Sequence, residues 1–175
     1  MNRMAWMGSQ FALAEPRRSV ATLSKLLAVI PLAAALVAPA FAFEVRPNPN
    51  MTNGSVRIDG QDVHATCGNS KAHRGSMTHA RRDEILMSYG LPPGTHPDYE
   101  IDHLIPLCLG GSDDLSNLWP QPRRSIEPKW NAEAKDRLER FMCDMVCGGH
   151  LGLATAQEAF AKDWIAAYQK YYEGY

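Results

Sequence analysis

The apolar positions in the second half of the chain recur with the period of a helix. Ile85, Leu86 and Tyr89 fall on one side of a helix expected from about residue 78 to 89, which Gly90 and the prolines after it end. A second helix is expected to begin near Asn131 and to close at the two glycines 148–149. Its apolar stripe is Ala134, Leu138, Phe141, Met142 and Met145.

A third helix is expected near the C-terminus. The pattern Thr155-x-x-Glu158 predicts a capping box at its start, because the threonine hydroxyl and the glutamate carboxylate can satisfy the first free N–H groups. Its apolar stripe is Phe160, Trp164, Ala167, Tyr168 and Tyr171. We expect this stripe and Trp119 to lie in the core.

Between the first two helices the pattern changes to that of strands. The segment 99–109 (YEIDHLIPLCL) predicts a strand, 110–114 (GGSDD) a turn, and 115–119 a short return strand. Pro120, Pro122 and Pro128 then predict a loop. The segment 43–60 is rich in Pro, Asn and Gly and predicts an irregular arm, with a short strand expected within 56–65. The elements together predict an α+β fold.

The first 42 residues predict a signal peptide. Residues 26–42 carry no charged side chain, follow Arg17, Arg18 and Lys25, and end in AFA at 40–42, a small-x-small cleavage pattern. An uncleaved anchor is the alternative, but the run is shorter than the roughly 20 residues that cross a bilayer, and two prolines interrupt it. We therefore expect export to the periplasm or the medium, with no stable membrane insertion.

The rest of the chain predicts one domain, with the arm at 43–60 and the folded part at 61–175. The whole chain has 18 Lys and Arg against 19 Asp and Glu; four of the basic residues and one acidic residue lie in the leader, which leaves a formal charge of −4. This size excludes a multidomain enzyme. The charge argues against binding nucleic acid through bulk positive charge, so any such contact needs a local basic patch.

The four cysteines all lie in this exported part, which favours disulfide bonds. A bond between Cys143 and Cys147 would span i,i+4 on one helix, where the geometry is poor. We therefore expect Cys67 and Cys108 each to join one member of that pair, without a choice between the two pairings. A zinc site is the alternative, but no CxxC is present.

Candidate chemistry is concentrated in residues 99–135. Asp102 offers a carboxylate oxygen and Asn117 an amide oxygen to a divalent cation, while His103 is suited to act as a general base near neutral pH. A strand pair crossed by a helix can gather these side chains. Metal-assisted attack of water on a phosphodiester needs such a base and such a metal. The alternative is that Asp102 only binds backbone amides and that His103 is a core imidazole.

The stretch DHLIPLCLGGSDDLSNLWPQP resembles the core of the HNH endonuclease superfamily, the ββα-metal nucleases, and specifically a group of small exported bacterial HNH-like proteins. The resemblance covers roughly residues 62–172. It implies a ββα-metal core with additional N- and C-terminal helices and disulfides. It also implies that His103 is the general base, that Asp102 is a metal ligand, and that Asn117 orients the base or contacts the metal. Mg²⁺ or Mn²⁺ is the expected ion, with Zn²⁺ as an alternative.

The chain departs from many HNH nucleases in its helix, because no histidine lies between Asn117 and Gly149. At about 100° per residue, Asn131 shares the stripe of Leu138 and Lys135 lies at its edge. We therefore predict Asn131 as a further metal ligand and Lys135 as a phosphate contact. The same geometry predicts that Glu133 and Asp136 point away from the strands.

Contacts to nucleic acid are expected from Arg123, Arg124 and Lys129 in the loop beside the site and from Arg74. Solvation of a surface is the alternative role for these side chains. The sequence thus predicts an exported metal-dependent endonuclease that acts on DNA, with RNA as a second substrate. The rival is a disulfide-stapled HNH-like binding module without catalysis. No protein partner follows from the sequence.

Overall fold

The computed structural model describes residues 45–67 and 74–174. The predicted signal peptide, 1–42, lies outside these residues. Within the described ranges no helix is long and apolar enough to cross a membrane. The described elements combine helices with one small antiparallel sheet, which agrees with the expected α+β class.

The sheet is formed by β1 (Tyr99–His103) and β2 (Leu118–Pro122), with Asp102 opposite Trp119 and His103 opposite Leu118. The first strand is shorter than predicted. It ends at His103, and Pro106 begins a 3-10 helix, η2 (Leu107–Leu109), because a proline has no N–H with which to continue a ladder.

The return strand lies later than predicted. Residues 115–117 form a second 3-10 helix, η3 (Leu115–Asn117), and β2 follows it. Pro120 and Pro122 belong to this strand, and so the prediction of a loop there was wrong. Each strand of a two-stranded sheet has one side without a partner, so a missing N–H on that side breaks no ladder bond.

The helices agree with the apolar pattern. α2 (His79–Ser88) is capped by Thr78, and α3 (Ala132–Cys147) follows Asn131. α4 (Leu153–Ala167) begins after Gly152, and so the predicted capping box at Thr155 was wrong, since the helix has started before that residue. A π-helical turn, η4 (Tyr168–Tyr172), continues α4.

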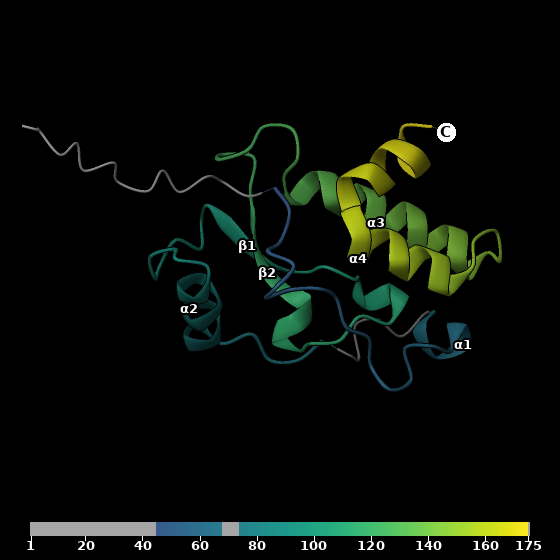
Figure 1. Ribbon diagram of the computed structural model, residues 1–175, viewed down its shortest axis with the longest axis horizontal. Coiled ribbons are helices and arrows are strands. Elements are labelled where there is room, and N and C mark those ends of the chain that lie inside the picture. The colour runs from purple at the N-terminus through teal and green to yellow at the C-terminus, as the bar shows by residue number, and fades with distance from the viewer. Residues whose placement is uncertain (1–44, 68–73, 175) are drawn as a thin grey trace, which may run out of the picture. The chain divides into compact units, whose positions relative to one another are not determined.

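The core lies where α3 and α4 pack on the strand pair and on η2 (Figure 1). Trp119 and Trp164 are buried, as predicted. Of the rest of the predicted stripe, α4 contributes Phe160 and Ala167 and η4 contributes Tyr168, while Tyr171 in η4 is only half-buried. The buried side chains that fill this core include Leu104, Leu109, Leu138, Met142, Val146, Ala156, Phe160, Ile165, Ala167 and Tyr168.

The described part of the N-terminal arm packs along the turn between the strands. Its backbone bonds run from Gly54 N to Ser116 O at 2.8 Å, from Ser112 N to Ser55 O at 3.0 Å and from Arg57 N to Gly110 O at 2.9 Å. The strand expected within 56–65 is reduced to a single bridge at Val56 and a short helix, α1 (Val63–Thr66). The arm is irregular, as predicted, and it braces the turn.

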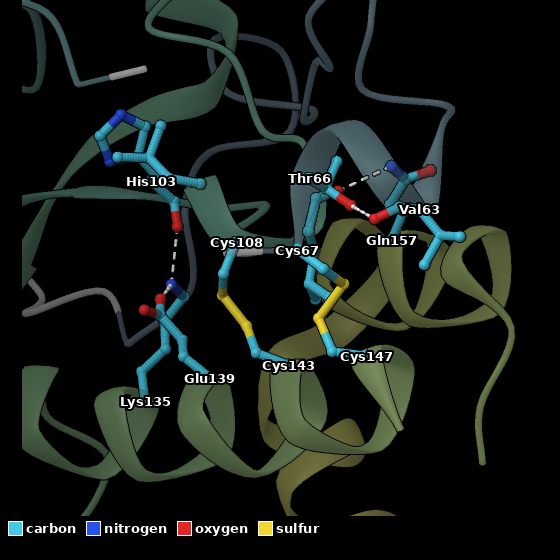
Figure 2. The surroundings of a disulfide bond; sticks show 12 residues. Val63, Thr66, Cys67, His103, Cys108, Lys135, Glu139, Cys143, Cys147 and Gln157 are labelled. Carbon is cyan, nitrogen blue, oxygen red and sulfur yellow. Dashed lines mark hydrogen bonds and ion pairs between the residues drawn. A yellow bond between two sulfur atoms is a disulfide. The ribbon is translucent and has the colours of Figure 1, made fainter. Parts of the chain in front are cut away.

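The prediction that Cys67 and Cys108 each form a disulfide with one of Cys143 and Cys147 is confirmed. Cys67 is bonded to Cys147 and Cys108 to Cys143, with Cα–Cα distances of 5.7 and 6.0 Å that suit a disulfide. Figure 2 shows the two bonds side by side on one face of α3. They attach α1 and η2 to the last turns of that helix. Such bonds are typical of an oxidising compartment.

Candidate active site

His103, the last residue of β1, forms a hydrogen-bonded pair with Asp113. Its Nε2 lies 2.7 Å from Asp113 Oδ1, which comes from the turn between η2 and η3. The backbone N–H of Gly75 also donates to Asp113, and Arg81 donates to its carbonyl oxygen. The carboxylate is therefore held from two sides before any substrate arrives.

The electrostatics of this pair set the protonation of both groups. Burial lowers the pKa of His103, and this outweighs the opposite effects of Asp113 and Asp102. Burial alone would raise the pKa of Asp113, but the hydrogen bonds from His103 and Gly75 bring it below its usual value. At neutral pH the carboxylate is ionised and accepts the Nε2 hydrogen of a neutral ring. His103 Nδ1 then keeps a lone pair with which it can accept a proton.

Asn117 holds the loop that carries Asp113. It is fully buried; its Oδ1 accepts from Ile105 N at 2.8 Å, and its Nδ2 donates to Ile105 O at 3.0 Å and Ser112 O at 2.9 Å. Gly111, in the same turn, packs closely against the backbone of Ile105. A larger residue would not fit there, because its Cβ would lie 1.8 Å from Ile105 O. The side-chain amide of Asn117 is thus engaged with the backbone of the turn that carries Asp113, the partner of His103. This arrangement suits the first of its two expected roles, orienting the base, better than the second, contacting the metal.

Asn131 is likewise a structural residue. Its Oδ1 accepts from Ala134 N at 2.9 Å and its Nδ2 donates to Glu127 O at 2.9 Å, which is the geometry of a helix N-cap. The sequence prediction placed it on the inward stripe correctly, since it is buried. Its side chain serves the first turn of α3, and so the structure does not bring it to Asp102 as a ligand.

Lys135 lies on the side of α3 that faces β1, but it cannot reach a phosphate. Its side chain has no exposed surface, and its three hydrogens are used by Asp102 Oδ2 at 2.7 Å, His103 O at 2.6 Å and Glu139 Oε1. Burial alone would lower the pKa of this ammonium, but Asp102 and Glu139 raise it above its usual value. The structure therefore places Lys135 as an internal cation and does not bring its ammonium to a surface where the predicted phosphate contact could form.

A polar cavity of about 150 Å³ opens beside this group. Asp136 lines it, which corrects the prediction that this side chain points away: α3 turns the side that carries Lys135, Asp136 and Glu139 towards β1, while Leu138 lies in the core. The lining residues are Arg74, Glu100, Ile101, Asp102, His103, Pro106, Leu107, Cys108, Asp136 and Glu139.

Negative charge is crowded in this cavity. Burial raises the pKa of Glu100 and Asp136, and the charge of Asp102 adds to both shifts. Burial also raises the pKa of Glu139 to about 7, against the opposing effect of Lys135. Four carboxylates line the cavity, those of Glu100, Asp102, Asp136 and Glu139. The cations nearby are the buried ammonium of Lys135, Arg74 at the lining and Arg123 at the edge.

The predicted nucleic-acid contacts are only partly brought together. Arg74 lines the cavity, and Arg123 lies at its edge in an ion pair with Glu100 at 3.0 Å. Arg124 and Lys129 are exposed and do not line it; the Lys129 ammonium lies 4.6 Å from the centre of the Trp130 ring.

A metal ion does not fit the predicted ligands. Asn117 and Asn131 are engaged elsewhere, and an ion bound at Asp102 would meet the buried ammonium of Lys135. In the ranges that the structure describes, no group of three His, Cys, Asp or Glu side chains is arranged to hold a metal ion. No chemical step is therefore assigned to a metal at Asp102.

Sequence reasoning missed Asp113 and Glu139. The signal for Glu139 was its i,i+4 spacing from Lys135, which places the two side chains on one face of the helix. No local pattern identified Asp113, which lies ten residues after His103 in an irregular turn. Only the three-dimensional course of that turn shows that Asp113 is the partner of His103.

Comparisons with models of protein families, with curated proteins and with solved structures find no match to this chain.

Proposed function

We propose that this chain is an exported HNH-type endonuclease that hydrolyses phosphodiester bonds of DNA, with His103 as the general base and RNA as a second substrate. The observation that carries the proposal is the His103–Asp113 hydrogen bond of 2.7 Å beside a polar cavity. The order of strand, turn, strand and helix around it agrees with the resemblance to the HNH core.

In this reaction His103 Nδ1 takes a proton from a water molecule as the water oxygen attacks phosphorus. The ring then carries a positive charge, and the ionised Asp113 at Nε2 stabilises it and fixes the ring orientation. The P–O bond to the leaving sugar oxygen breaks, and that oxygen takes a proton from solvent. The His103 proton returns to bulk water.

Substrate binding needs positive charge, since the cavity itself is acidic. Arg74 at the lining and Arg123 at the edge are the candidates for contacts to phosphate oxygens. Arg124 and Lys129 extend the basic side chains along the exposed loop after β2. Such contacts hold the backbone of the nucleic acid without reading its sequence, so we expect little sequence preference.

The experiment is nicking of supercoiled plasmid by purified oxidised protein, compared with His103→Ala. Mg²⁺, Mn²⁺ and EDTA are tested in parallel, so that a metal requirement does not hide activity. We expect His103→Ala to lower the rate by about 10²–10⁴-fold, the usual contribution of a general base. His150→Ala is the matched control, because His150 is exposed and does not line the cavity. Equal rates for wild type and His103→Ala would refute the proposal.

The second candidate is a binding module with an HNH-like scaffold. The observation that favours it is the ion pair of Lys135 with Asp102, which fills the place expected for a metal. A binding module retains DNA in a mobility-shift assay, produces no nicks under any metal condition, and binds equally well after His103→Ala. If the protein is an endonuclease, wild type nicks the plasmid and His103→Ala does not.

A further inference from the structure

Three oxygen atoms from β1 and α3 surround the ammonium group of Lys135. They are Asp102 Oδ2 at 2.7 Å, the carbonyl oxygen of His103 at 2.6 Å, and Glu139 Oε1. Figure 2 shows the Lys135 ammonium beside Glu139 and bonded to the His103 carbonyl oxygen. The ammonium itself is fully buried, while Asp102 and Glu139 also line the polar cavity.

Two carboxylates and a backbone carbonyl are also the donors that hard divalent cations prefer. Here the same oxygens serve a cation that is covalently part of the chain. The three hydrogens of an ammonium match the three acceptors one to one, so none of its donors remains for a further ligand. A divalent ion at these oxygens would lie against a buried positive charge, and the two cannot occupy the place together.

We propose that the Lys135 ammonium is the resident cation of this centre, in the place that a divalent ion would need, and that removing it creates a divalent-cation site. The wild-type chain then binds no divalent ion through Asp102. The absence of a histidine ligand on α3 fits this arrangement, since an internal ammonium needs no further metal ligand there. The inference goes beyond the proposed function, because it concerns cation binding and holds whether or not His103 hydrolyses DNA.

The first experiment compares wild type with Asp102→Asn by titration with Mn²⁺, followed by electron paramagnetic resonance of the free ion. We expect the two titrations to coincide. Mn²⁺ binding by wild type that Asp102→Asn abolishes overturns the proposal. This comparison requires no change at Lys135, so it decides the question even if a Lys135 variant fails to fold.

The second experiment replaces the cation with a neutral side chain of similar length, Lys135→Met. We expect this variant to gain one equivalent of bound Mn²⁺ and to melt roughly 10 °C higher at a Mn²⁺ concentration about 100 times its Kd. The double variant Lys135→Met/Asp102→Asn is the matched control and should lose both effects. A folded Lys135→Met protein that binds no Mn²⁺ contradicts the proposal. Neither readout is nuclease activity, so a failure of the proposed function leaves this test intact.

Discussion

Asn117 illustrates at the scale of a single residue how the turn that carries Asp113 is held. Its side-chain amide bonds to both backbone groups of Ile105 and to the carbonyl oxygen of Ser112, and all three of these bonds are buried. An uncompensated buried polar group is costly. We expect Asn117→Ala to lower the free energy of unfolding by about 3 kcal/mol, measured by guanidinium denaturation with the disulfides intact.

The matched comparison is Asn131→Ala. This change removes one helix cap, so we expect a loss of about 1 kcal/mol. The two asparagines have the same chemistry and are both buried. If Asn117→Ala loses no more stability than Asn131→Ala, the bonds of Asn117 to Ile105 and Ser112 contribute little to the fold. Asn117 would then not be the residue that positions the turn.

At the scale of elements, the disulfide between Cys108 and Cys143 connects η2 to α3 next to the cavity, which Cys108 lines. The bond between Cys67 and Cys147 connects α1 to the same helix, and neither cysteine lines the cavity. In the chain-entropy account each bond stabilises the fold by about 4 kcal/mol, because the closed loops of 35 and 80 residues differ little on a logarithmic scale.

The double variants Cys108→Ser/Cys143→Ser and Cys67→Ser/Cys147→Ser should therefore lose similar stability in denaturant titrations. We expect only the first to lower the rate of plasmid nicking at a temperature where both remain folded. The reason is that η2 leads into the turn that places Asp113 beside His103. Equal nicking rates in the two variants would contradict this link between η2 and the site.

At the scale of the whole molecule, the crowded carboxylates make stability depend on pH. Glu139 has an ordinary pKa of 4.5, which the fold raises to about 7. Between these values the folded state keeps a proton that the unfolded state has lost, so this group's contribution to stability falls as pH rises from 4.5 to about 7. His103 opposes it, since a lowered pKa makes its contribution fall as pH drops below 6.5.

Glu139→Gln isolates the first effect, because the amide does not titrate and its oxygen can still accept from Lys135. The free energy of unfolding is measured by urea titration at pH 5, 6, 7 and 8. We expect it to decrease less between pH 5 and pH 8 in Glu139→Gln than in wild type. A larger loss in the variant would mean that Lys135 keeps Glu139 ionised throughout this range.

The sequence predicted the parts of the fold that follow local rules. The apolar stripes located α2, α3 and α4, and helix geometry restricted the disulfides to long-range pairs. Local rules failed where tertiary contacts decide: β2 includes two prolines because its strand has a side without a partner, and Lys135 is buried because Asp102 and Glu139 converge on it. Asp113 could not be predicted, since an irregular turn determines where its carboxylate lies.

The pH dependence of plasmid nicking in wild type and Asp113→Asn tests directly whether His103, paired with Asp113, is the general base. We expect a wild-type rate that is constant near neutral pH and falls only at a pH below 6.5, where His103 becomes protonated. Asp113 raises the pKa of His103 from the value that burial alone would give. Asp113→Asn should therefore lower the plateau and move the fall to more acidic pH. An unchanged profile in Asp113→Asn, or a wild-type rate that rises only above neutral pH, would contradict the role of His103 as a general base supported by Asp113.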